Sequence, residues 1–168
     1  MKRALAFVSL LSLLGLVALS CDPVHDNAVS SLGGETPGVA PGPLHRPGQP
    51  CLLCHDGQGN DPPAFALAGT IFLDANSPTP AVGATVSLMD ASGKTASQTT
   101  NAAGNFYFDP ATFSPKFPVH VTGVAMGGVS VVMHSHIGGN GSCAGCHADP
   151  AGPDSPGHVY LQIVGTSP

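Results

Sequence analysis

Hydrophobic and polar residues alternate along several short segments between residues 64 and 134. In the clearest one, the apolar Ala84, Val86 and Leu88 are separated by Thr85 and Ser87, as in a strand that buries one face. Comparable segments lie near 64–73, 94–100, 105–108, 119–124, 129–134 and 158–164, and Gly127-Gly128 has the composition of a two-residue hairpin turn. About seven short strands with regular turns predict a mainly β fold, a single antiparallel β-sandwich with a core over 64–134 and a final strand over 158–164.

The first twenty residues have the pattern of a signal peptide. Lys2 and Arg3 precede an apolar run, 4–19, that is shorter than the roughly 20 residues a membrane-spanning helix needs. The sequence Ala18-Leu19-Ser20-Cys21 that follows resembles a bacterial lipobox, although Ala18 stands where Leu is usual. That resemblance implies cleavage after residue 20 and lipidation of Cys21. Ordinary cleavage near Ser20, which would leave a free cysteine, is the alternative.

Residues 21–50 read as a lipid anchor followed by a tether. The segment holds six prolines and five glycines and shows no apolar periodicity, so it buries too little surface to offset its ordering entropy. We therefore expect a flexible connection that holds a folded domain, 51–168, away from a membrane.

Charge and composition narrow the possible partners. The chain has five Lys and Arg against ten Asp and Glu, and it loses two of the five basic residues with the signal peptide. This acidic balance argues against nucleic acid, which requires a basic surface. The eight histidines are many for a chain so poor in charge, and histidine is the commonest metal ligand.

Two C-x-x-C-H motifs, 51–55 and 143–147, account for four of the five cysteines. This spacing is the signature of c-type haem attachment. Two thiols three residues apart can add to the two vinyl groups of one haem, and the next residue places an imidazole on the iron. The sequence thus predicts two covalently bound haems, held by Cys51, Cys54, Cys143 and Cys146, with His55 and His147 as proximal iron ligands.

Two other interpretations of the cysteine pairs are open. Two C-x-x-C pairs can hold structural zinc, but zinc gives no reason for a histidine at the same offset in both copies. A thioredoxin-like dithiol belongs with a βαβ pattern, and no such pattern is present in the sequence.

The segment between the motifs resembles a carboxypeptidase-regulatory-like (transthyretin-like) domain over residues 66 to about 126. The resemblance is carried by four stretches: 69–72, 82–88, 90–93 and 100–106. It implies a sandwich fold that is usually non-catalytic. The whole arrangement is similar to small dihaem c-type lipoproteins of bacteria rich in multihaem cytochromes. If six strands alternate in direction before Cys143, both motifs fall at one pole of the sandwich.

The sixth iron ligands must come from the remaining side chains. We expect His45 first, six residues before Cys51, then His136 and His134 at the end of the sixth strand, and then His158. Met126 and Met133 are rivals because Met/His ligation occurs in cytochromes, but core packing is the simpler role for Met133. His25 in the tether and His120 are expected to be exposed.

These features predict an electron carrier rather than an enzyme. Two six-coordinate haems would pass single electrons at the cell envelope, to redox partners such as multihaem cytochromes, through a basic surface of the partner. One alternative is a haem enzyme with an open iron site, as in dihaem peroxidases, which resemble larger all-α chains. Another is a haem-bearing binding or structural module of a larger cytochrome assembly.

Overall fold

The computed structural model describes residues 23–35, 37–58 and 62–161. It divides the chain into two units, 1–33 and 34–168. In the first, helix α2 runs over Pro23–Ser31, with Pro23 in its first turn, where its missing N–H costs nothing, and Gly33 beyond its end at φ 73°. In the described residues, no helix is both long and apolar enough to cross a lipid bilayer.

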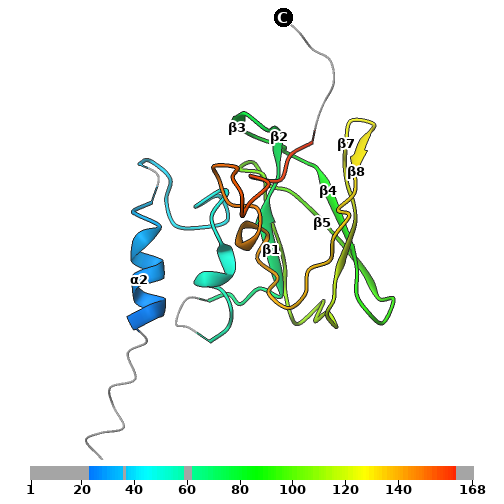
Figure 1. Cartoon of the computed structure of the whole chain (residues 1–168), viewed down its shortest axis with the longest axis horizontal. Helices are drawn as coiled ribbons and strands as arrows, with labels where there is room; N and C mark the ends of the chain where they lie inside the picture. Colours follow the sequence, from blue (N-terminus) through cyan, green and yellow to red (C-terminus); the bar gives the residue numbers. More distant parts are fainter. Residues whose placement is uncertain (1–22, 36, 59–61, 162–168) are drawn as a thin grey trace, which may run out of the picture. The chain divides into compact units, whose positions relative to one another are not determined.

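The second unit is an antiparallel β-sandwich of three sheets (Figure 1). A four-stranded sheet has the order β5-β4-β7-β8, and two-stranded sheets pair β1 with β6 and β2 with β3. The strands are β1 Leu67–Thr70, β2 Phe72–Asp74, β3 Ser77–Pro80, β4 Thr85–Met89, β5 Thr95–Thr99, β6 Asn105–Phe108, β7 His120–Met126 and β8 Val129–Val131. The mainly β fold is thus as the sequence predicted.

The four-stranded sheet follows its hydrophobic pattern. Val86 and Leu88 of β4 are buried while Thr85 and Met89 are exposed. In β7 the buried residues, Val121 and Val124, are three apart, because the pairing with β4 shifts between Ser87 and Leu88. Such a bulge adds one residue and restores the inward direction of the side chains that follow. The Gly127–Gly128 turn is present as predicted, with φ of 59° and 83°.

β1 lies in the middle of the fold and is buried along its whole length. It pairs with β6, and Leu67 and Phe108 stand opposite each other at one end. The core between the sheets combines side chains from all parts of the second unit: Leu67, Ile71, Ala81, Ala84, Val86, Leu88, Phe106, Phe108, Phe113, Val119, Val121, Val124 and Leu161.

The strand predictions differ from the structure in three places. The segment 64–73 forms two strands rather than one, because the Ile71 amide turns to the Gly104 carbonyl between them. β3 has no counterpart in the prediction, since its two prolines and polar residues show no alternation. Of the last predicted strand, 158–164, Tyr160 forms an isolated bridge with Phe72, and residues 162–164 lie outside the described residues.

The segment expected to be a flexible tether is partly ordered. Besides helix α2, residues 43–50 are bound to the sandwich. The side-chain amide of Asn105 donates to the carbonyls of Pro43 and His45 at 3.3 and 3.0 Å, and the Gly48 amide donates to Thr70 Oγ1 at 2.8 Å. Backbone groups of this irregular segment therefore find their partners on β1 and β6, which composition alone does not indicate. Cys21 lies outside the described residues.

Candidate functional site

The two C-x-x-C-H motifs adopt the same local conformation. Each begins with a single turn of 3-10 helix, η1 (Cys51–Leu53) and η2 (Cys143–Gly145). Each ends on a cysteine in right-handed helical conformation, with φ, ψ of −104°, −31° at Cys54 and −116°, −30° at Cys146. Helical neighbours three and four residues apart share a face, so each motif presents its two thiols and its imidazole on one side.

The histidine of each motif is anchored in the same way. Its amide donates to the carbonyl of the first cysteine, at 3.0 Å for His55 and 2.8 Å for His147. Its ring Nδ1 lies 2.9 Å from the Pro63 carbonyl in the first motif and 3.1 Å from the Gly157 carbonyl in the second. A carbonyl oxygen only accepts, so Nδ1 carries the proton and the lone pair is on Nε2. Histidines that bind metals are typically oriented by such a second bond.

The four thiols of the motifs are not joined in disulfides. Burial raises the pKa of Cys51, and burial, followed by the neighbouring Cys51 and Cys146, raises the pKa of Cys143 to about 12. Reactive dithiols depend on a cysteine whose pKa is lowered. The environment of these two cysteines is therefore unlike that of a thioredoxin-type pair.

β1 brings the motifs together. Ala68 donates to the Gly141 carbonyl at 3.0 Å and forms a bridge with Ser142, which places η2 directly against the strand. Just before the start of β1, the amide of Phe65 donates to the His55 carbonyl at 2.8 Å. Figure 1 shows both short helices, η1 turquoise and η2 orange-brown, at the same side of β1.

The close approach of η2 depends on two glycines. A Cβ on Gly69 would lie 2.7 Å from both Cβ and Sγ of Cys143, and one on Gly141 would overlap the backbone of Ala66 and Leu67. η2 lies along the side of β1 at Gly69, whereas the first motif is bound just before the strand begins. The expectation of a shared pole assumed six strands before Cys143, and the structure has eight among the described residues.

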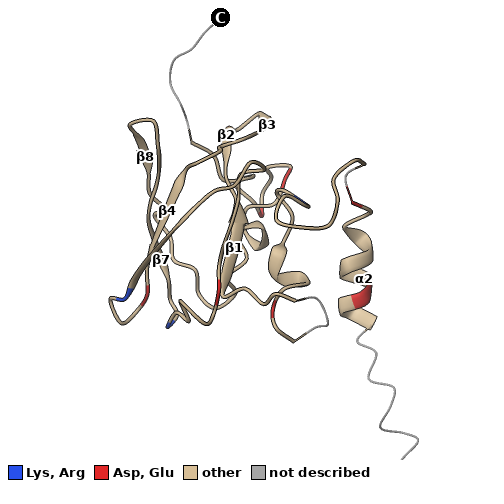
Figure 2. Ribbon diagram, turned by 180° about the vertical axis from the view of Figure 1, so that it is seen from behind, with Lys and Arg blue, Asp and Glu red and all other residues tan. Residues whose placement is uncertain are grey.

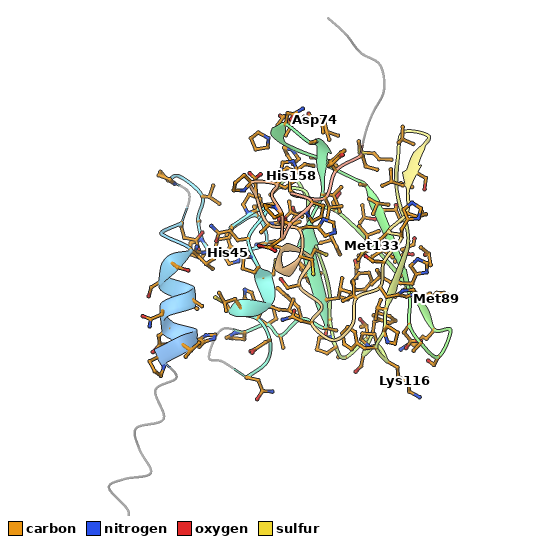
Figure 3. All side chains as sticks on the ribbon, viewed as in Figure 1. His45, Asp74, Met89, Lys116, Met133 and His158 are labelled. Atoms are coloured by element: carbon orange, nitrogen blue, oxygen red, sulfur yellow. The ribbon has the colours of Figure 1, made fainter. Side chains whose placement is uncertain are left out.

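His45 is the predicted distal residue that lies beside a motif. Its ring centre is 5.9 Å from that of His55, with the planes tilted by 42°. Its Nδ1 is 3.6 Å from Glu35 Oε1, which also accepts from Arg46 Nε at 3.0 Å. Both His45 Nδ1 and Glu35 Oε2 are buried without a hydrogen-bond partner, and each such atom costs about 1–3 kcal/mol. Figure 3 shows His45 next to η1.

His158 lies close to the second motif in the chain but is held by other groups. It follows Gly157, whose carbonyl binds His147. Its Nε2 is 3.0 Å from the Asp74 carbonyl, and its ring packs 4.5 Å from that of Phe72. Nε2 therefore carries a proton and donates it to the Asp74 carbonyl. Figure 3 labels both residues, at the end of the sandwich where β2 and β3 lie.

His134 and His136 belong to the segment beside β7. The ring of His136 lies 4.9 Å from that of His120, whose Nε2 is 2.9 Å from the Met133 carbonyl. His120 is half-buried rather than fully exposed, because this segment covers it. Met126 and Met133 pack against the core, the role expected for Met133. Within the described residues, no hydrogen bond or ring contact joins any of these side chains to either motif.

Sequence reasoning missed Glu35, Gly69 and Asn105. Glu35 stands in an irregular segment with no motif around it, and Gly69 is one of 22 glycines. The signal that could have identified Gly69 is a glycine inside a strand, which often marks a close approach of another backbone or a ligand.

Charged side chains are sparse around the motifs. Asp56, Asp149 and Asp154 are exposed next to them in the chain, and the nearest cation, Arg46, is paired with Glu35. The lysines that the structure describes lie elsewhere, since the backbone amides of Lys94 and Lys116 donate to Asp90 beside the β4–β5 turn. Figure 2 shows the blue segments at the end of the sandwich below β4 and β7.

The chain matches no known protein family, no curated protein and no solved structure. Among the described residues, no three His, Cys, Asp or Glu side chains converge on one point where a metal ion would bind.

Proposed function

We propose that the protein is a dihaem c-type cytochrome that passes single electrons at the bacterial cell envelope. The observation that supports this most strongly is that the two C-x-x-C-H motifs have the same local conformation and the same histidine anchoring. Each presents two cysteines that are not joined in a disulfide and an imidazole whose Nδ1 donates to a backbone carbonyl. The two motifs begin 92 positions apart in the sequence, and the same geometry in both is what we expect if both hold the same group.

A c-type haem supplies an iron that changes between ferric and ferrous states one electron at a time. The chain's own residues hold it. Cys51 and Cys54 at one motif, and Cys143 and Cys146 at the other, supply the thioether bonds. His55 and His147 supply Nε2 to the iron, and their bonds to Pro63 and Gly157 prevent the rings from turning.

The attachment of both motifs to the same part of the sandwich supports a carrier in which the two haems exchange electrons. Both motifs are attached at β1, the second through Ala68 and Gly141 and the first through Phe65, which precedes the strand. The haems would therefore be attached to one rigid element, at a separation that does not vary from molecule to molecule. Lipidation at Cys21, and the likeness of 66–126 to a carboxypeptidase-regulatory-like domain, stay predictions of the sequence.

The test is the ferric spin state and redox behaviour of the protein produced in a host that matures c-type cytochromes. An electron carrier is low-spin at both irons, takes up one electron per haem reversibly, and turns over no peroxide. A high-spin iron accompanied by peroxide turnover would contradict the proposal and favour the enzyme. A protein that carries no haem would contradict both.

A further inference from the structure

The separation between His45 and His55 is the one expected for two imidazoles that share an iron. A metal–imidazole nitrogen bond is about 2 Å long, so two imidazoles on opposite sides of one iron have ring centres about 6 Å apart. The His45 and His55 ring centres are 5.9 Å apart. The other histidine pair, His120 and His136, is packed more closely, at 4.9 Å.

The sandwich, rather than the motif, holds His45 in place. The His45 carbonyl accepts from the Asn105 side chain at 3.0 Å, and Asn105 Oδ1 in turn accepts from Thr70 Oγ1 at 2.7 Å. The same hydroxyl accepts from the Gly48 amide at 2.8 Å. This buried chain of hydrogen bonds joins β1 and β6 to both sides of His45. Its side chain is therefore presented to His55 by the fold.

Glu35 completes the arrangement on the far side of the ring. Its Oε1 accepts from Arg46 and lies 3.6 Å from His45 Nδ1, whereas Oε2 has no hydrogen-bond partner. Nδ1 of His45 also has no partner and is buried. A small rotation of either side chain would bring His45 Nδ1 within hydrogen-bond distance of Glu35 Oε2, so that both buried atoms gain a partner. A proton on Nδ1 then leaves the lone pair on Nε2, as in His55.

We infer that His45 is the sixth ligand of the iron held by the first motif, and that Glu35 is the residue that positions it. The inference rests on the proposed function, because it requires a haem at Cys51 and Cys54. A carboxylate bound to a ligand imidazole makes the imidazole more basic and favours the ferric iron. In the described residues no histidine ring packs against His147, so the two haems differ in their surroundings.

The first test removes the ligand. His45→Ala should convert one of the two ferric haems from low spin to high spin by electron paramagnetic resonance, while the haem content stays at two. Added imidazole should restore the low-spin signal, and His45→Met should stay low-spin with a higher potential. The matched variants are His134→Ala and His158→Ala, which should leave the first haem unchanged.

The second test separates positioning from folding. Glu35→Gln keeps the shape and removes the charge, and it should raise the midpoint potential of one haem without changing the spin state. Asp154→Asn, an exposed carboxylate in the other motif's loop, is the control for loss of one negative charge and should leave that potential in place.

The outcomes distinguish this inference from the proposed function. A His45→Ala protein with two haems, both fully low-spin, overturns the role of His45 and leaves the cytochrome intact. If His134→Ala or His158→Ala, rather than His45→Ala, converts the first haem to high spin, that residue is its sixth ligand. An unchanged potential in Glu35→Gln overturns the role of Glu35. A wild-type protein without haem overturns the proposed function itself.

Discussion

Cys143 lies so close to Gly69 that any side chain at position 69 would clash with it. A Cβ at this position would be 2.7 Å from Cβ and Sγ of the cysteine and 3.2 Å from the ring of Phe106. One missing side chain on β1 thus allows the second C-x-x-C-H motif to lie on the body of the sandwich. The relationship connects the fold to the site and can be tested by mutation.

Gly69→Ala should therefore disturb the second motif selectively. Overpacking of this kind costs about 1–3 kcal/mol, and η2 can relieve it by moving away from β1. We expect a lower unfolding midpoint and a loss of covalent haem at the second motif, measured as haem per chain. Gly123→Ala, in β7, has ordinary space around it and is the control. Full haem and wild-type stability in Gly69→Ala would show that the contact does not matter.

Asn105→Ala should release the segment that carries His45. The substitution removes the side-chain donor to the His45 carbonyl and the acceptor of the Thr70 hydroxyl, which costs about 1–3 kcal/mol, whereas the Pro43 carbonyl still accepts from Asn101. Amide exchange at Gly48 should become faster, as measured by hydrogen–deuterium exchange. Gln98→Ala, an exposed residue of β5, is the control. Unchanged protection at Gly48 would mean that other contacts hold this segment.

Asp90 makes the stability of the four-stranded sheet depend on pH. Amides of Lys116, Ser92 and Lys94 and the Ser92 hydroxyl donate to its carboxylate, which lowers its pKa to about 2. In an unfolded chain an aspartate has a pKa of about 3.9. The stabilisation is thus complete above pH 4 and lost as the pH falls towards 2.

Asp90→Asn should accordingly unfold at a lower temperature than the wild type at pH 7, with a difference that shrinks between pH 4 and pH 2. Asp154→Asn makes the same change of charge at an exposed site and should follow the wild type. A difference between Asp90→Asn and the wild type that is constant with pH would assign the effect to shape rather than to ionisation.

The parts of the molecule that were predictable from sequence depend on local signals. The spacing of Cys51, Cys54 and His55 defines a motif without reference to the fold, and the Asn105–Phe108 strand lies where the apolar pattern placed it. The strand at Ser77–Pro80 and the docking of His45 depend on partners far away in the chain. Long-range hydrogen bonds such as that of His45 leave no pattern in a short stretch of sequence. The attachment of both motifs at β1 leaves none either.

The acidic surroundings of the motifs predict a basic redox partner. Exposed Asp56, Asp149 and Asp154, together with the haem propionates, would attract a positive surface, and the two lysines among the described residues lie near the β4–β5 turn. The second-order rate of electron transfer to a basic acceptor should fall steeply between low and physiological salt. A flat response, or faster transfer to an acidic acceptor of equal driving force, would mean that charge does not guide this encounter.

The most direct test of the central claim is the number of covalent haems per chain. We predict two for the wild type, one for Cys54→Ala, one for Cys146→Ala and none that is stably attached in the double variant, determined by pyridine haemochrome assay and intact mass. Met89→Ala, an exposed methionine of β4, is processed alongside and should keep both haems. Two full haems in either cysteine variant, or a wild-type protein that carries zinc and no haem, would contradict the account.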